Sequence, residues 1–329
     1  AVWVRKCNSN VHCNRSADFR RTIPSVFETK GRLKNMVSTI SAFSKRCCET
    51  KKKTVKDIVF KTVFSVVGLL VLTIFVYPLI YTVINSLKTY EDFSHNPQYA
   101  FPTKVYFGNY LKVLQNDFGR YFFNSIVIAL LVVVFTVLLA CMAAFVLSKM
   151  VFRGQRALEV FFLLGLMIPY QVVLLPLYLT YSQIGLMDTY WSLVLPQVAF
   201  GLPFSIQLFL AFFHGFENEL IEAAIIDGCS MARVFTRIVV PLCRNVIITI
   251  ATLRAIFSWN EYIFANTFVS RKKMMTVVLG LNSFIGEEGR VDWGPTFAAI
   301  AATVIPTLLI YLFLSKYMQE GLSEGAVKG

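Results

Sequence analysis

Charged residues are scarce in this sequence. Asp, Glu, Lys and Arg make up 16% of the 329 residues, whereas soluble globular domains carry about a quarter, and 56% of the residues are hydrophobic. Also absent is the pattern G-x-x-x-x-G-K-[ST], the loop that cradles nucleotide phosphates. The low charge argues against an ordinary water-soluble domain. The missing loop predicts that this chain hydrolyses no ATP and is not an enzyme.

Long apolar runs without charge are abundant instead. A helix that crosses a hydrocarbon core about 30 Å thick needs roughly 20 apolar residues, and only helices or closed barrels satisfy the backbone there. Six stretches have this length: 62–87, 121–148, 160–185, 189–214, 245–269 and 294–315. The fifth is the least regular, because it contains Arg254 and Glu261. We therefore predict an all-α membrane protein with six transmembrane helices.

Positive charge is concentrated before the first span. Residues 1–61 hold 15 Lys or Arg and 4 Asp or Glu, so they carry +11 of the net +13. A basic arm could bind nucleic acid, but Lys and Arg beside a span usually anchor it on the cytoplasmic side. We predict a basic cytoplasmic arm at 1–55, with little periodicity and partial disorder, and a six-span membrane domain at 56–329. Six spans then place both termini in the cytoplasm, and no nucleic acid is expected as a partner.

Four of the seven cysteines lie in this arm: Cys7, Cys13, Cys47 and Cys48, with His12 beside Cys13. Their spacing matches no standard zinc pattern. We predict no metal site, and reduced thiols are the simpler interpretation.

A polar segment, residues 214–241, follows the fourth predicted span. Leu220, Ala223, Ala224 and Asp227 recur at helical spacing. Gly228 suits a helix stop, and Ser230 and Pro241 suit the start and end of a second short helix. The pattern predicts a helix, a sharp turn and a second helix at the cytoplasmic face. It fits an interfacial connector and a coupling element seated in a soluble partner equally well.

The residues of this segment also carry a resemblance. Glu222-Ala223-Ala224, Gly228, Ile238 and Pro241 resemble the E-A-A-x-x-x-G-x(9)-I-x-L-P loop of permease subunits in binding-protein-dependent ATP-binding-cassette importers, with Val240 in place of the usual Leu. The resemblance favours the coupling interpretation. It implies that the ATPase docks on Glu222, Ala223, Ala224, Asp227, Gly228, Ile238 and Pro241.

Further motifs are similar to the carbohydrate-uptake branch of that family. They are Asn124-Ser125, the stretch 143–154, Met167-Ile168-Pro169 with Gln171, Trp259-Asn260-Glu261 and the C-terminal G-L-S-E-G-A-V-K-G. The tail, within 316–329, resembles the smaller maltose-type permease. This implies that Gly325, Ala326, Val327, Lys328 and Gly329 reach toward an ATPase interface.

The resemblance also implies a set of partners in a bacterial or archaeal cytoplasmic membrane. These are a second related permease, a dimer of cytoplasmic ATPases that use ATP and Mg, and an extracytoplasmic sugar-binding protein. This chain is expected to bind no cofactor itself. The alternatives are a permease for an amino acid, phosphate or metal, and a secondary transporter. The latter would more often show carboxylates in several spans or an internal repeat.

The fifth span holds the candidate pore or gate residues. Arg254 and Glu261 are ionisable groups in an apolar run, where charge is costly and usually faces a cavity or a partner. Trp259 and Asn260 could add stacking and hydrogen bonding to a sugar. The alternative is a structural pair, because seven residues separate Arg254 from Glu261 and would place both on one face of a helix. We favour structure or gating over direct sugar contact.

Overall fold

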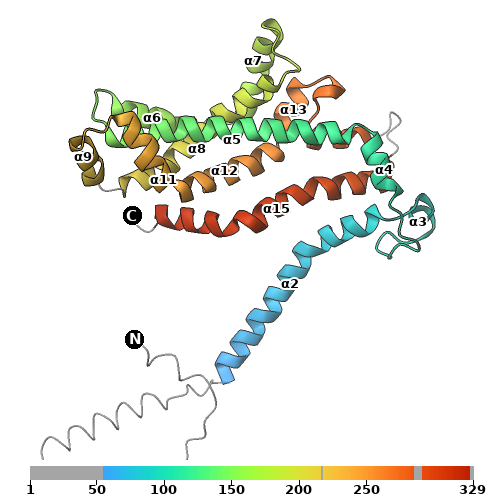
Figure 1. The fold of residues 1–329 in the computed structure, drawn as a ribbon. Helices are drawn as coiled ribbons and strands as arrows, with labels where there is room; N and C mark the ends of the chain where they lie inside the picture. Colours follow the sequence, from blue (N-terminus) through green and yellow to red (C-terminus); the bar gives the residue numbers. More distant parts are fainter. Residues whose placement is uncertain (1–54, 216–217, 285–290, 327–329) are drawn as a thin grey trace, which may run out of the picture. The chain divides into compact units, whose positions relative to one another are not determined.

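The computed structural model describes residues 55–215, 218–284 and 291–326. Every regular element in these ranges is a helix, which confirms the predicted all-α fold (Figure 1). Residues 1–54 of the predicted basic arm lie outside the described residues. The predictions made for its cysteines and for His12 lie outside them too.

Four helices are long and apolar enough to cross a membrane: α2 (Val55–Ser86), α5 (Phe118–Lys149), α8 (Tyr190–His214) and α15 (Trp293–Ala326). They correspond to the first, second, fourth and sixth predicted spans. Two further helix pairs have the length and composition to cross if each pair forms one bent span. With both pairs included, the described part of the chain has the six predicted spans.

The third predicted span, 160–185, is not the single helix that we expected. It consists of α6 (Gln155–Gly165) and α7 (Tyr170–Gln183), which meet at 94°. Pro169 stands at the start of α7 with φ −70° and ψ 124°. Proline donates no backbone hydrogen bond and disfavours a helical conformation in the residue before it, so the helix breaks there.

The fifth predicted span, 245–269, is also divided. α12 (Arg244–Trp259) ends before Asn260, and a separate helix, α13 (Ile263–Phe268), follows. At its other end, the segment Met231–Leu242 meets α12 at 75°. The span is therefore shorter than predicted, and it is bent where it joins the polar segment.

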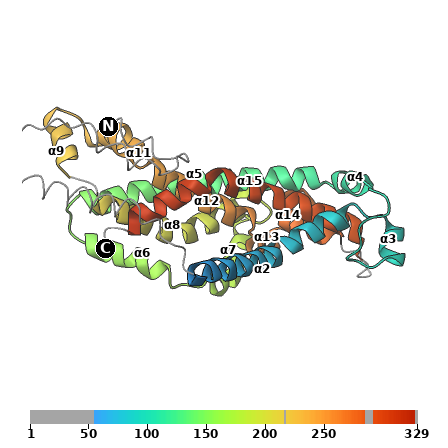
Figure 2. The same ribbon diagram turned by 90° about the horizontal axis from the view of Figure 1, so that it is seen from below.

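The core lies where α5, α8, α12 and α15 run alongside one another (Figures 1 and 2). Ala140 and Ala144 on α5 are fully buried and allow close helix approach. Phe209 and Phe213 of α8 pack in the same cluster. Small residues facing large aromatic ones fill this interface.

The α2 helix runs across the boundary between two compact units, residues 1–72 and 73–329. Its large apolar side chains, such as Phe64, Leu69 and Phe75, are mostly exposed. Such an apolar surface is suited to the interior of a membrane, because water cannot solvate it favourably.

Short helices cover the two ends of the bundle. One end, here called the loop end, carries α9 (Asn218–Ile226), α10 (Met231–Val234), the π-helix η2 (Phe235–Val239) and α11 (Val240–Leu242). The opposite end, here called the far end, carries α3 (Tyr90–His95), α4 (Gly108–Gln115), η3 (Lys272–Met274), α14 (Val277–Gly280) and η4 (Leu281–Phe284). The candidate coupling residues lie at the loop end.

Candidate functional site

The turn at Gly228 has the predicted form. The residue has φ +83°, in the left-handed region that glycine adopts without strain. The Cys229 N–H donates to the Ala224 carbonyl over 2.9 Å, and the Gly228 N–H donates to the Ile225 carbonyl over 2.9 Å. This pair of bonds is the Schellman motif, which satisfies the last carbonyls of a helix. It ends α9 and redirects the chain toward α10.

The second helix is less regular than predicted. Ser230 occupies the N-cap position of α10, but its side chain makes no capping hydrogen bond. After Val234 the backbone continues as the π-helix η2, which contains Ile238. Pro241 then lies in the first turn of α11, where its missing N–H costs nothing. The helix–turn–helix is present, with a π-helical second arm; such bulges are frequent at functional sites.

The α9 helix has one face toward the spans and one face outward. Ile221 and Ala224 are buried in the cluster that includes Phe145 of α5 and Phe213 of α8. The outward side exposes Glu222, Ala223 and Ile226, with Glu219 beside them and Asp227 directly after the helix. The two alanines of the E-A-A motif therefore point in different directions. Only Ala223 is available to a partner.

Ile226 is the residue of this face that the motif did not single out. Its side chain is 85% exposed, so it is available to a partner. It lies three residues after Ala223 and four after Glu222, so helical spacing alone could have placed it on the same face. An exposed isoleucine between acidic residues is suited to an apolar contact in a protein groove.

The predicted tail is described only in part. α15 continues to Ala326, so Gly325 and Ala326 belong to a helix. Val327, Lys328 and Gly329 lie outside the described residues. An ATPase contact by the tail stays a prediction.

Arg254 and Glu261 do not form the structural pair that we considered. The Glu261 carboxylate accepts hydrogen bonds from the Phe264 N–H over 2.6 Å and the Ala265 N–H over 3.1 Å, so it caps α13. Arg254 donates from its guanidinium to the Gln197 carbonyl of α8 over 2.8 Å. The helix ends between them: Glu261 bonds to the backbone that directly follows it, and Arg254 contacts the neighbouring helix α8.

Arg254 also fixes the contact between α12 and α8. A Cβ atom at Gly201 would lie 2.6 Å from the guanidinium carbon, so only glycine leaves room for this side chain. The Nε atom is buried without a hydrogen-bond partner among the described residues. A buried, partly unsatisfied guanidinium is costly. Arg254 therefore remains the strongest of the pore or gate predictions.

Trp259 and Asn260 make contacts within the chain. The buried Trp259 indole donates to the Thr303 carbonyl of α15 over 3.0 Å, and its ring meets Phe122 of α5 edge-on at 5.0 Å. The exposed Asn260 amide donates to the Ile256 carbonyl over 2.8 Å and helps to end α12. These contacts give Trp259 a packing function and Asn260 a capping function. A role for either in a pore stays a prediction.

Asn124 and Ser125 anchor the far end, a function that sequence reasoning missed. The buried Asn124 amide donates to the Lys273 carbonyl over 3.0 Å and the Met275 carbonyl over 2.9 Å, and its oxygen accepts from Tyr190 over 2.8 Å. The Ser125 hydroxyl accepts from the Val277 N–H over 2.8 Å. A polar pair inside an apolar run was the available signal, because buried amides need partners.

Comparison with known proteins gives consistent matches. Residues 136–323 match the family described as "Binding-protein-dependent transport system inner membrane component". The chain is 35% identical to the probable ABC transporter permease protein YurM of Bacillus subtilis, over 77% of this chain and 84% of the relative. It is 33% identical to the trehalose/maltose transport system permease protein MalG of Thermococcus litoralis, over 83% and 99%.

A solved structure has the same fold. It is a bacterial ABC transporter involved in the import of the acidic polysaccharide alginate, with a TM-score of 0.70 and 22% sequence identity. The alignment covers 80% of this chain and 97% of that one. The chain therefore shares the overall fold of that transporter chain.

Proposed function

The chain belongs to the family of binding-protein-dependent transport system inner membrane components, and on that premise we propose that it is the permease subunit of an ATP-driven importer of a sugar or oligosaccharide. The sugar class is supported by the relative that transports trehalose and maltose, and by the branch-like tail. We further propose a second related permease, a dimer of ATPases and an extracytoplasmic binding protein as partners. ATP and Mg would be used by the ATPases.

One observation carries this proposal: α9 is fastened to the spans on one side and open on the other. Ile221 and Ala224 share a packed cluster with Phe145 and Phe213. Lys149, at the end of α5, also donates to the Asn218 side chain over 2.7 Å. A partner that moved the outward face of α9 would therefore move α5 and α8, because close-packed side chains transmit displacement.

The proposed sequence of events needs two states of the whole assembly. Closure of the ATPase dimer on ATP would displace α9 at the loop end and change the access of the sugar path across the membrane. Such coupling requires the partner to contact the two states differently, and typical coupling free energies are about 1–3 kcal/mol. In this arrangement the loop end and the basic arm are cytoplasmic, and the far end faces the binding protein.

Reconstitution tests this function. The chain would be co-expressed with the ATPase, permease and binding-protein genes of the same organism, purified and placed in proteoliposomes. We expect the complex to retain the ATPase and a neutral sugar to stimulate ATP hydrolysis and enter the vesicles. Purification without any ATPase would refute the permease proposal. Stimulation by an amino acid, phosphate or a metal ion alone would refute the sugar class.

A further inference from the structure

A pocket of about 450 Å³ lies at the far end, where α3, α4 and the start of α15 meet. Its volume is within the range of about 300–1,000 Å³ that is typical of small-molecule sites. The side chains that matter for its chemistry are Tyr90, Glu91, Lys104, Lys112, Asp292 and Trp293. They come from two stretches far apart in the sequence, residues 90–112 and 292–293, and none of them lies in the coupling loop or among the predicted pore residues.

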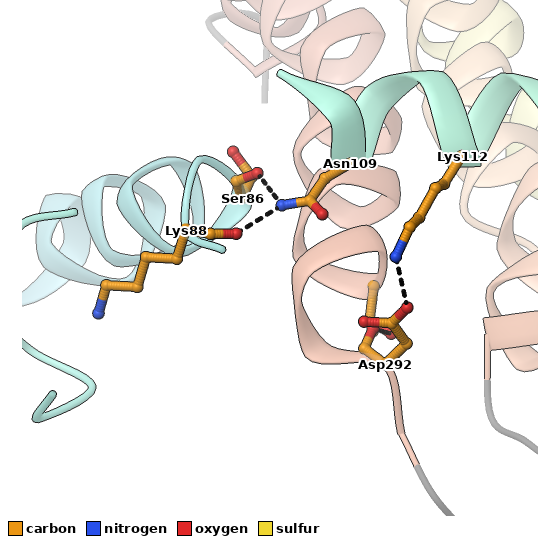
Figure 3. A network of polar contacts seen from close by, with 6 residues as sticks. Ser86, Lys88, Asn109, Lys112 and Asp292 are labelled. Atoms are coloured by element: carbon orange, nitrogen blue, oxygen red, sulfur yellow. Dashed lines mark hydrogen bonds and ion pairs between the residues drawn. The ribbon is translucent and has the colours of Figure 1, made fainter. Parts of the chain in front are cut away.

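The floor of the pocket is held by hydrogen bonds to the backbone. The Asn109 side chain donates to the carbonyls of Ser86 over 2.9 Å and Lys88 over 2.8 Å (Figure 3). A Cβ atom at Gly294 would lie 2.7 Å from the Asn109 oxygen, so glycine allows α15 to begin directly against α4. The floor therefore joins the end of α2, α4 and α15.

Hydrogen bonds to the segment that follows α3 hold the pocket wall formed by this helix in place. The buried Asp92 carboxylate accepts from the Thr103 hydroxyl over 2.6 Å and from the Asn96 amide over 3.0 Å. The buried Lys88 ammonium donates to the Gln98 carbonyl over 2.7 Å and lies 5.7 Å from the centre of the Phe93 ring. A site whose supporting side chains are already fixed loses little entropy when a ligand binds.

The aromatic surface of the pocket is largely uncovered. Tyr90 is 81% exposed and Trp293 is 50% exposed, and the Trp293 ring lies 5.9 Å from Phe297, on which Phe93 stacks from another side. Tyr and Trp rings combine an apolar face with a polar edge. Such rings can stack on the apolar face of a sugar ring while its hydroxyl groups reach the polar side chains nearby.

The charges of the pocket balance. Lys112 pairs with Asp292 at 3.2 Å, as Figure 3 shows. Glu91 and Lys104 make no side-chain hydrogen bond or ion pair with any residue that the structure describes. Among the described lining residues, one acid and one base stand beside a neutral pair and supply both acceptors and donors with balanced charge. This arrangement disfavours a phosphate or a metal ion and suits a neutral polyol.

We propose that this pocket is a binding subsite for a neutral saccharide on the far side of the membrane, with Trp293 and Tyr90 as the stacking surface and Glu91 and Lys104 as hydroxyl partners. The inference rests on the proposed function, because it takes the transported solute to be a sugar. The alternative occupant of the pocket is the surface of a partner protein. It would bury about 800 Å² on each partner in a standard interface, a larger area than a hollow of this size offers.

Direct binding to the reconstituted full complex tests the proposal. Calorimetric titration would use maltose, trehalose, cellobiose and N,N′-diacetylchitobiose as probes, with inorganic phosphate as the charged comparison and binding protein omitted. We expect Trp293→Ala to weaken sugar binding at least about tenfold and Tyr90→Ala several-fold. Trp293→Phe should restore most of the affinity, because it keeps an aromatic face. Phosphate should not bind.

Tyr99→Ala is the matched control for Tyr90→Ala. Tyr99 is 75% exposed in the turn that follows α3 but does not line the pocket, so its removal should change sugar binding by less than about twofold. If the Trp293 variant fails to insert, Glu91→Gln provides the test, because Glu91 is exposed and its side chain has no partner in the described part of the chain. It should weaken binding without lowering the membrane level.

Three results would refute the proposal that this pocket binds a saccharide. They are no binding of any of the four sugars by the unmodified complex, unchanged affinity in all pocket variants, and loss of binding-protein docking in variants that still bind sugar. The second and third leave the permease function intact, because uptake and ATPase retention are read separately. Loss of sugar-stimulated uptake from the unmodified complex, with the ATPase retained, would instead refute the sugar class itself.

Discussion

Replacing Gly228 by leucine should uncouple the ATPase while leaving the chain in the membrane. Gly228 has φ +83°, and leucine in that conformation costs about 1–2 kcal/mol. No heavy atom lies within 4 Å of a Cβ atom built there, so the chain itself adds no steric penalty. The cost is modest against the packing of six spans but comparable to a coupling free energy of about 1–3 kcal/mol. Docking or coupling should therefore fail before folding does.

Gly185 provides the matched control. It has φ +71°, its Cβ position is equally open, and it lies in the turn between α7 and α8 at the far end. Gly185→Leu should strain the backbone by a similar amount without touching the loop end. Gly228→Asn should rescue coupling in part, because asparagine tolerates the left-handed region better than leucine.

The assay reads three quantities in the same cells: membrane level of the chain, co-purification of the ATPase and sugar uptake. We expect Gly228→Leu to keep a normal membrane level and to lose ATPase co-purification or sugar uptake. Gly185→Leu should still co-purify with the ATPase. Equal loss of the ATPase in both variants would refute a specific function for the loop turn. Normal uptake by Gly228→Leu would show that the turn at Gly228 only connects two helices.

Three other perturbations test separate parts of the account. Ile226→Asp should prevent ATPase retention, because the new carboxylate places a charge on the outward face of α9. Tyr99→Asp is the exposed control, and it should retain the ATPase. Retention of the ATPase by Ile226→Asp would show that Ile226 does not lie in the interface. Asn124→Leu should lower the free energy of unfolding by about 1–3 kcal/mol, because it leaves the Lys273 and Met275 carbonyls without their hydrogen-bond donor. An unchanged melting temperature in detergent would contradict the anchoring function of Asn124. The Thr103 hydrogen bond lowers the pKa of Asp92, so its stabilisation is present above about pH 4 and is lost as pH falls through the lowered value. The stability difference between the native chain and Asp92→Asn should therefore shrink from pH 6 to pH 3, and a constant difference would contradict it.

The local features of the fold were predictable from the sequence. Runs without charge located the spans, because a bilayer imposes one length on every helix. Gly228 marked the turn, since few other residues adopt its backbone conformation. Pro169 stands at the 94° break that divides the third span, which we had predicted as one helix.

Features that depend on distant residues were not predictable. No glycine or proline lies between 245 and 269, so nothing marked the end of α12 at Trp259. Arg254 donates a hydrogen bond to a carbonyl on α8 that lies 57 residues away in the sequence, and Asn124 donates one to a carbonyl 149 residues away. The far-end pocket combines α3, α4 and α15 in the same way. Periodicity reports which face of a helix is apolar, but it does not report which element will cover that face.

Contact between α9 and the ATPase is the central claim, and photocrosslinking in the assembled importer tests it most directly. A photoreactive phenylalanine analogue would replace Ile226, with Val105 as an exposed apolar control at the far end. The account predicts an adduct between position 226 and the ATPase, and none from position 105. An ATPase adduct from position 105, or none from 226 in a complex that still imports sugar, would contradict it.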